Sequence, residues 1–249
     1  MSYGKEVQKA NKEFYDIAAN IYEEADGRRK DFPLWLEDII KKLALETKGE
    51  RLIDFGSGSG WIAKVALKYF KHVIAVDISD VILRKIDGHL YKVNSTLEEL
   101  PFKSESVDVI TCFAVLHHIN DFKPVFHETF RILRKNGIFY SDHDLSKEFM
   151  DRFYIPMKIY RKITNPEGRY LKMDKRLTEE LYKKSEIHSE GIASSDVSSL
   201  LTEAGFHKVD YNYHWLGLNG LTDFLFGYQG HKGVKCSWAP LLSVTAIKT

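Results

Sequence analysis

A nine-residue segment with three alternating glycines constrains the fold of this chain more than any other feature. Residues 52–60 read Leu-Ile-Asp-Phe-Gly-Ser-Gly-Ser-Gly, so that Gly56, Gly58 and Gly60 directly follow an apolar stretch. Because glycine has no Cβ and adopts backbone angles that other residues avoid, a turn of this kind lets a ligand lie against bare backbone. The segment therefore predicts a buried strand, a turn that binds a nucleotide-like ligand, and a helix, in that order.

Two acidic residues indicate which ligand the turn would bind. Asp54 lies beside the glycines, where its carboxylate would repel a pyrophosphate and would suit a ligand that carries an ammonium group. Dinucleotide-binding turns also place their third glycine one residue later. Asp77 ends the next apolar run, 72–77, and an acid at this position accepts hydrogen bonds from ribose hydroxyls. The alternative is that Asp54 caps a helix turn and Asp77 only ends a strand.

From residue 51 onward, short apolar stretches alternate with amphipathic ones. This alternation predicts a parallel sheet that is covered by helices on both faces. Ser194 or Ser195 is placed to cap the last predicted helix, and Gly205 is placed to end it. The predicted strands lie near 51–55, 72–77, 89–93, 107–113, 138–143, 207–215 and 242–248, and the predicted helices near 60–70, 80–87, 122–134 and 194–204.

Three segments depart from this alternation. Residues 5–47 have the periodicity of two helices, which Gly27 and Pro33 separate. Residues 145–191 form an insertion that is rich in aromatic and charged residues, and its aromatics could wall an acceptor pocket or pack a helical cap onto the sheet. A stretch with several glycines between 217 and 233 is typical of a mobile loop or partial lid.

Several ordered segments together resemble the class I S-adenosylmethionine-dependent methyltransferases, in the branch typified by quinone and sterol methyltransferases. The segments that carry the resemblance are 54–60, Asp77, 97–102 with 106–110, 115–119 and 130–137. The resemblance implies an α/β fold with a doubly wound, mostly parallel seven-stranded sheet of order 3-2-1-4-5-7-6, in which strand seven is antiparallel. It also implies S-adenosylmethionine as cofactor and a single domain over 1–249, with an N-terminal helical roof over 1–47 and a substrate cap over 145–191.

The same resemblance implies a set of cofactor contacts. Asp54 would hold the amino group, Asp77 the ribose hydroxyls, and Ile78 would pack on the adenine. The family often has an aspartate where this chain has Ser95 and Thr96, so a hydroxyl or a backbone amide must replace it at the adenine edge. The predicted cofactor-binding residues are Tyr15, Asp54, Gly56, Ser57, Gly58, Gly60, Asp77, Ile78, Ser95, Thr96, Leu97, Cys112, Ala114 and His117.

Three histidines are candidates for a general base, which a methyl acceptor needs if it must lose a proton. His117 and His118 follow the fourth strand, and His143 lies between Asp142 and Asp144 at the end of the fifth. His117 and His118 could instead cap or pack the short turn that they begin. No metal site is predicted, because no acid after the fourth strand completes a ligand set with residues 142–144.

The charge balance favours a small-molecule partner. The chain has 36 basic and 35 acidic residues, so it has no overall field that would attract nucleic acid or an anionic membrane, although local patches remain open. The insertion has basic clusters at 161–162, 175–176 and 183–184, which keep an RNA or protein substrate as an alternative. A regulatory protein that binds the cofactor without turnover is a further alternative.

The remaining features of composition concern cellular location. The two cysteines are too few for a disulfide framework, and the N-terminus reads as lacking an apolar signal segment. No run reaches the ~18 apolar residues that a membrane-spanning helix needs. The sequence therefore predicts a cytoplasmic monomer or homodimer with no membrane partner.

Overall fold

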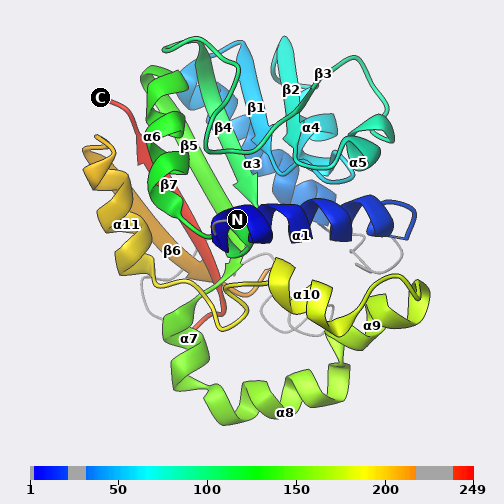
Figure 1. The fold of residues 1–249 in the computed structure, drawn as a ribbon. Helices are drawn as coiled ribbons and strands as arrows, with labels where there is room; N and C mark the ends of the chain where they lie inside the picture. The colour runs from blue at the N-terminus through cyan, green and yellow to red at the C-terminus, as the bar shows by residue number, and fades with distance from the viewer. Residues whose placement is uncertain (1–2, 22–31, 217–237) are drawn as a thin grey trace.

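The computed structural model describes residues 3–21, 32–216 and 238–249 (Figure 1). Seven strands form one sheet in the order β3-β2-β1-β4-β5-β7-β6, in which β7 is antiparallel to both neighbours and all other pairs are parallel. This arrangement confirms the predicted sheet. The strands are β1 (Arg51–Phe55), β2 (His72–Asp77), β3 (Tyr91–Asn94), β4 (Val107–Phe113), β5 (Leu133–Leu145), β6 (Lys208–His214) and β7 (Leu241–Ile247).

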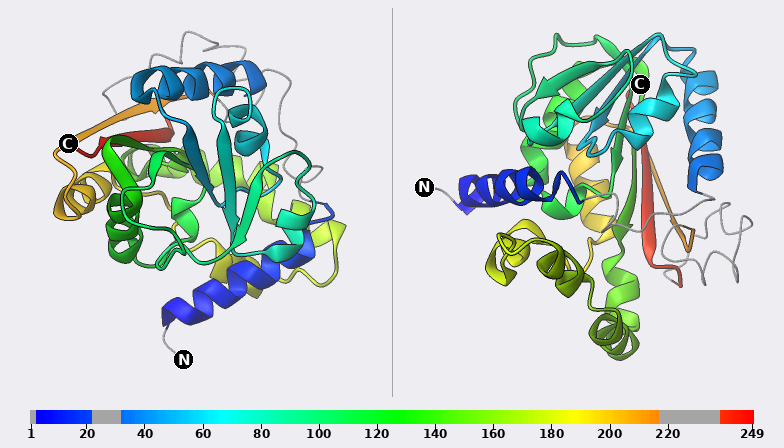
Figure 2. Two further views of the ribbon diagram at one scale, coloured as in Figure 1. Left: turned by 90° about the horizontal axis from the view of Figure 1, so that it is seen from above. Right: turned by 90° about the vertical axis from the view of Figure 1, so that its right-hand side faces the viewer.

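Helices cover both faces of the sheet, as the alternation predicted (Figure 2). On one face, α3 (Phe32–Thr47) and α4 (Trp61–Ala66) pack around the buried ring of Trp35. On the other face, α6 (Phe122–Ile132) and α11 (Ser194–Glu203) pack around Phe126. The short helix α5 (Asp80–Arg84) follows β2. The core thus has two layers of apolar side chains, one on each side of the strands.

The helix α1 (Tyr3–Ala18) lies apart from these layers, across the ends of the strands and against the insertion (Figure 1). Its Phe14 packs with Leu177 and Tyr182 of the insertion. The roof predicted over 1–47 therefore consists of α1, whereas α3 lies on a sheet face because its apolar side is buried there. The insertion contains α7 (Lys147–Arg152), α8 (Tyr154–Thr164), α9 (Pro166–Met173) and α10 (Glu179–Ser185).

Some helix boundaries differ from the predicted ones. Pro33 lies inside the first turn of α3, where a missing N–H costs nothing. Ala193, which has no side chain able to cap, occupies the N-cap of α11, because the Ser194 hydroxyl donates to Glu148 over 2.7 Å instead. Gly205 has a φ of +113° and ends this helix as predicted. Gly27 and the glycine-rich stretch 217–233 fall outside the described residues.

The end of β5 carries a bulge. Its register against β7 shifts between Ser141 and Asp144, and His143 has a left-handed φ of +68°. In a regular strand residues 142 and 144 would point to the same face, but an extra residue re-aims the side chains. Asp142 accordingly contacts His214 near α3, whereas Asp144 contacts His117 after β4.

Candidate functional site

A cavity of about 450 Å³ opens at the carboxyl ends of the parallel strands, beneath α1. Ligands of doubly wound sheets bind at this edge, near the point where the strand order reverses. Loops after β1, β2, β3 and β4 supply its walls. The predicted site residues that line it are Tyr15, Asp54, Gly56, Ser57, Gly58, Asp77, Ile78, Ser95, Thr96, Leu97, Ala114 and His118. Gly60, Cys112, His117 and His143 do not line it.

All three glycines of the turn have left-handed backbone angles, with φ values of +60°, +50° and +78° for Gly56, Gly58 and Gly60. A Cβ on Gly60 would lie 2.4 Å from the side chain of Ile86, so packing against Ile86 requires a glycine here. The side chain of Cys112 is fully buried in the core. Neither residue lines the cavity, and their contacts with a cofactor stay predictions.

Asp54 presents a buried, partly unused carboxylate to the cavity. Its Oδ1 accepts a 2.9 Å hydrogen bond from the Thr111 hydroxyl, while Oδ2 has no hydrogen-bond partner among the residues that the structure describes. Burial raises the pKa of this carboxyl to about 7, with the hydrogen bond from Thr111 opposing the rise. An unpaired buried carboxylate oxygen is costly. A ligand that brings an ammonium group would supply the missing partner.

Asp77 lies on the same wall but is held by backbone donors. Its Oδ2 accepts from the Gly58 N–H over 3.0 Å, and its Oδ1 accepts from the Ser79 N–H over 2.9 Å. Burial raises the pKa of this carboxyl to about 6, with those hydrogen bonds opposing the rise. The Gly58 contact ties the carboxylate to the glycine turn and fixes it toward the cavity. The arrangement suits two neighbouring hydroxyl donors on a ligand.

The helix α1 adds a polar residue that the sequence reading missed. Asn11 is buried, donates to the carbonyl of His118 over 3.2 Å, and leaves its Oδ1 without a partner among the described residues. Val7, Asn11 and Tyr15 all line the cavity at a spacing of four residues, so they lie on one face of the helix. This spacing of four residues could have identified Asn11 from the sequence. An asparagine between apolar residues on a buried face indicates a ligand contact.

His118 is the only predicted base that lines the cavity. Its Nδ1 lies 2.7 Å from the carbonyl oxygen of Ser185 and its Nε2 lies 2.8 Å from the Tyr15 hydroxyl. Since a carbonyl only accepts, Nδ1 carries the proton and Nε2 accepts from the tyrosine. Burial, together with the neighbouring His117, lowers the pKa of His118 to about 4. The imidazole is therefore neutral at physiological pH, with its basic nitrogen toward α1.

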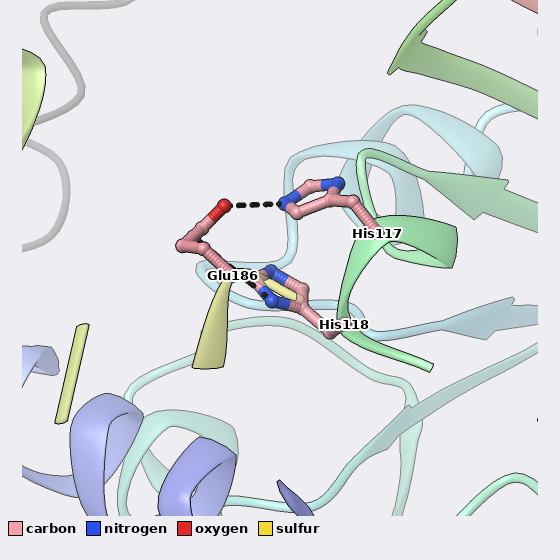
Figure 3. A group of neighbouring side chains, drawn as sticks. All are labelled: His117, His118 and Glu186. Carbon is pink, nitrogen blue, oxygen red and sulfur yellow. Dashed lines mark ion pairs between the residues drawn. The ribbon is translucent and has the colours of Figure 1, made fainter. Parts of the chain in front are cut away.

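His117 lies beside His118 but contacts different residues. Its Nδ1 is 2.7 Å from Asp144 Oδ1, and its Nε2 is 3.4 Å from Glu186 Oε2. Figure 3 shows Glu186 reaching toward both imidazoles from beyond the end of α10. We call His117, His118 and Glu186 the cavity cluster. It fastens the segment after β4 to the insertion.

His143 belongs to a second group, on the α3 side of the sheet. Its backbone N–H and its Nδ1 both approach Asp142 Oδ1, which also accepts from His214 Nε2 over 2.7 Å. The ring of Trp35 packs against both imidazoles. We call Asp142, His143 and His214 the core cluster. His143 thus lies among buried side chains and does not line the cavity, and its candidacy as a base stays a prediction.

Both clusters have the residue types that can hold a metal ion. In the core cluster the imidazole nitrogens lie 3.1 and 2.7 Å from Asp142 Oδ1, which are hydrogen-bond distances. In the cavity cluster Glu186 lies 3.4 Å from His117 Nε2 and 4.0 Å from His118 Nδ1. Those separations suit metal ligands better, but Nδ1 of His118 already has the Ser185 carbonyl as partner. We therefore assign the cavity cluster to hydrogen bonding.

The insertion does not contribute residues to the cavity lining. Phe149 and Phe153 pack against each other, and Tyr170 and Tyr182 surround Phe14 of α1. Tyr170 and Tyr182 therefore hold the insertion on α1, whereas the alternative interpretation had the aromatics pack a cap onto the sheet. The basic residues of the insertion are likewise engaged locally: Arg176 pairs with Asp174, Lys183 with Glu179 and Lys184 with Glu180.

Comparisons with known proteins agree with this geometry. The family model for the methyltransferase domain matches residues 53–141. A probable S-adenosylmethionine-dependent methyltransferase of Saccharomyces cerevisiae is 30% identical over 161 residues, which cover 59% of this chain and 54% of that protein. The ubiquinone/menaquinone biosynthesis C-methyltransferase of Vibrio campbellii is 30% identical over 104 residues, covering 36% of this chain and 39% of its own.

Solved structures extend the likeness to the whole fold. A possible histamine N-methyltransferase of Thermotoga maritima superposes with a TM-score of 0.58 at 17% identity, covering 95% of this chain and 99% of the other. At that identity the match concerns the fold alone. The chain spans about half or less of the length of the curated sequence relatives that it matches.

Proposed function

Because residues 53–141 form a methyltransferase domain of the class I S-adenosylmethionine-dependent type, we propose that the protein is an enzyme that methylates O, N or C of a small, partly apolar acceptor. One observation carries this proposal. The cavity presents the unpaired Oδ2 of Asp54 and the backbone-held carboxylate of Asp77 on one wall, which suits an aminoacyl group and a ribose. S-adenosylmethionine carries both groups and, when bound, supplies a methyl group activated on a sulfonium.

The chain itself would do three things. Asp54 and Asp77 would hold the two ends of the cofactor, and α1 would exclude water from above. Tyr15 and His118 would handle the acceptor proton: Tyr15 lines the cavity and its hydroxyl donates to Nε2 of His118, whose Nδ1–H is fixed by a carbonyl. As the Tyr15 oxygen takes the acceptor proton, the hydroxyl would pass its own proton to Nε2 of His118, 2.8 Å away.

The basic residues of the insertion support a small acceptor over RNA or protein. Three of the four residues that would have marked a macromolecular groove, Arg176, Lys183 and Lys184, pair with acids on their own segments, and none lines the cavity. The Vibrio relative is named for C-methylation in ubiquinone and menaquinone biosynthesis, which makes a planar quinone-like ring the first acceptor to try.

The test begins with the cofactor. Calorimetric titration with S-adenosylhomocysteine should show binding, and titration with NAD should show none. Asp77→Ala should weaken binding by about 1.5–3 kcal/mol, because charge-assisted hydrogen bonds are lost. Asp80→Ala removes a nearby, partly exposed carboxylate that pairs with Lys12 and Arg84 and does not line the cavity, and it should leave affinity unchanged. Equal affinity in wild type and Asp77→Ala would refute the ribose assignment.

Catalysis is tested separately from binding. Release of S-adenosylhomocysteine is followed with a panel of quinones, phenols and amines as acceptors. Turnover with one class would establish the enzyme and its acceptor chemistry together. Tight cofactor binding with no turnover on the panel, and with a transcript or protein extract as well, would favour the non-catalytic regulatory alternative.

A further inference from the structure

The helix α8 exposes large apolar side chains along its outer side. Ile155, Ile159 and Ile163 have exposed fractions of 68%, 56% and 78%, and their spacing of four residues places them in one stripe. Figures 1 and 2 show α8 at the outer rim of the insertion, on the side away from the sheet. The stripe is therefore turned outward rather than toward the core.

This exposure is concentrated in one place. Nine large apolar or aromatic side chains are exposed in the described part of the chain, and five of them belong to the eleven residues of α8. The others outside α8 are scattered, except Trp238. That ring lies 5.7 Å from the ring of Phe153, next to the start of α8. An exposed apolar group of this kind marks an interaction surface, because scattered single residues are the normal case.

The charge along α8 has one sign. The helix contains Lys158, Arg161 and Lys162 and no acidic residue. Arg161 turns inward and pairs with Glu190, whereas neither lysine forms an ion pair with any residue that the structure describes. Lys158 and Lys162 each follow an isoleucine of the stripe by three residues, so they flank it on one side. The Arg152 guanidinium, 5.2 Å from the Trp238 ring, adds a cation at the end of the stripe.

We propose that α8 binds the surface of an anionic lipid membrane. The three isoleucines would enter the boundary between headgroups and acyl chains, and the lysines would lie among lipid phosphates. Apolar residues flanked by lysines, with an adjacent tryptophan and arginine, match the composition of such a boundary better than that of a protein groove. In the described ranges no helix is long and apolar enough to cross a bilayer, so binding takes place in the plane of the surface.

Membrane binding by α8 differs from the expectation of no membrane partner, and it extends the proposed function. The near-zero net charge predicted no membrane partner, but α8 gathers cations and apolar surface into one local patch. If the proposed function holds, the patch places the enzyme where a lipophilic acceptor is dissolved. Membrane binding itself does not depend on catalysis.

Vesicle sedimentation tests the proposal with the full chain. Wild-type protein should sediment with mixed phosphatidylcholine and phosphatidylglycerol vesicles, and much less with phosphatidylcholine alone. The double variant Ile155→Glu/Ile159→Glu should bind the mixed vesicles more than about tenfold more weakly. Leu45→Glu is the matched control, since Leu45 is 67% exposed on α3 and should bind as wild type does.

A second variant separates charge from apolar contact. Lys158→Gln/Lys162→Gln should weaken binding to the mixed vesicles roughly thirtyfold and reduce its salt dependence. Failure of wild type to sediment with the mixed vesicles would overturn the proposal, as would wild-type binding by the double isoleucine variant. A dimer that this variant dissociates, without vesicle binding, would assign α8 to a second copy instead. S-adenosylhomocysteine affinity should be equal in all of these proteins, so a failed cofactor test remains distinguishable.

Discussion

The cavity cluster and the core cluster each combine two histidines with one carboxylate, but they differ in how these groups are spaced and in what they face. In the core cluster one carboxylate, Asp142, accepts hydrogen bonds from His143, His214 and the Tyr140 hydroxyl, and both of its oxygens are engaged. Burial raises the pKa of Asp142, but the two histidines outweigh this effect and hold the pKa well below its usual range. In the cavity cluster the carboxylate and imidazole atoms lie farther apart, and His118 faces the cavity.

The difference shows that a histidine's position after a strand does not decide its role. The core cluster comes from β5 and β6 and is closed by Trp35. The cavity cluster joins residues from after β4 and after α10, and it touches α1 through Tyr15. Since His118 lines the cavity, the cavity cluster is suited to respond to a ligand. The core cluster lies away from the cavity lining with both oxygens of Asp142 engaged, so it is suited to stabilise the fold.

The sharpest way to break the comparison is to replace one histidine from each cluster. His118→Gln should lower turnover by roughly 10²–10⁴-fold, the usual contribution of a general base, with S-adenosylhomocysteine affinity unchanged. His143→Gln should leave turnover unchanged when both proteins are assayed well below their unfolding temperatures. Equal turnover in His118→Gln and wild type would remove His118 from the proposed mechanism.

The free energy of unfolding should be more sensitive to a change at Asp142 than to a change at Asp144. Asp142→Asn places an amide against donors that need a carboxylate and should lower the free energy of unfolding by about 3–5 kcal/mol. Asp144→Asn keeps the acceptor oxygen for His117 and should cost about 1 kcal/mol. Urea unfolding of both variants measures the difference. Losses of similar size would mean that Asp142 and Asp144, the carboxylate beside the cavity cluster, stabilise the fold alike.

Lowering the pH should remove the stability that His118 contributes to the fold. Its pKa in the folded protein, about 4, lies below the ordinary value of 6.5, so the unfolded chain binds more protons between these values. The stability that His118 contributes is present above pH 6.5 and is lost as the pH falls toward 4. Between pH 7 and pH 5, wild type should lose about 2 kcal/mol relative to His118→Gln. Comparison with the variant cancels the opposite effects of Asp54 and Asp77, whose pKa values are raised.

The smallest effect is expected from metal removal. Both ring nitrogens of His118 already have protein partners, so a chelator should leave the turnover and stability of the protein unchanged. Activity that is lost on chelation and restored by zinc would show that the cavity cluster opens to hold a cation, and would sharpen the contrast with the core cluster.

The alternation of apolar and amphipathic stretches could predict a parallel sheet, and the family resemblance implied its order. The glycine turn and the two acids could be placed at the cavity because they are local features of consecutive residues. The sequence could not separate His118 from His143, since the bulge that turns Asp142 toward α3 leaves no signal in the residues around it. Asn11 was missed because its role depends on which face α1 presents. The exposure of α8 was likewise hidden, because its isoleucines have the spacing of an ordinary buried helix face.

The bulge at His143 separates the contacts of Asp142 from those of Asp144 at one strand end. Because a single extra residue turns positions 142 and 144 toward different partners, a substitution at 144 would act on His117 and the segment after β4 rather than on the polar group under Trp35. Without the bulge, the two carboxylates would point to the same face, and a change at one would also be a change beside the other.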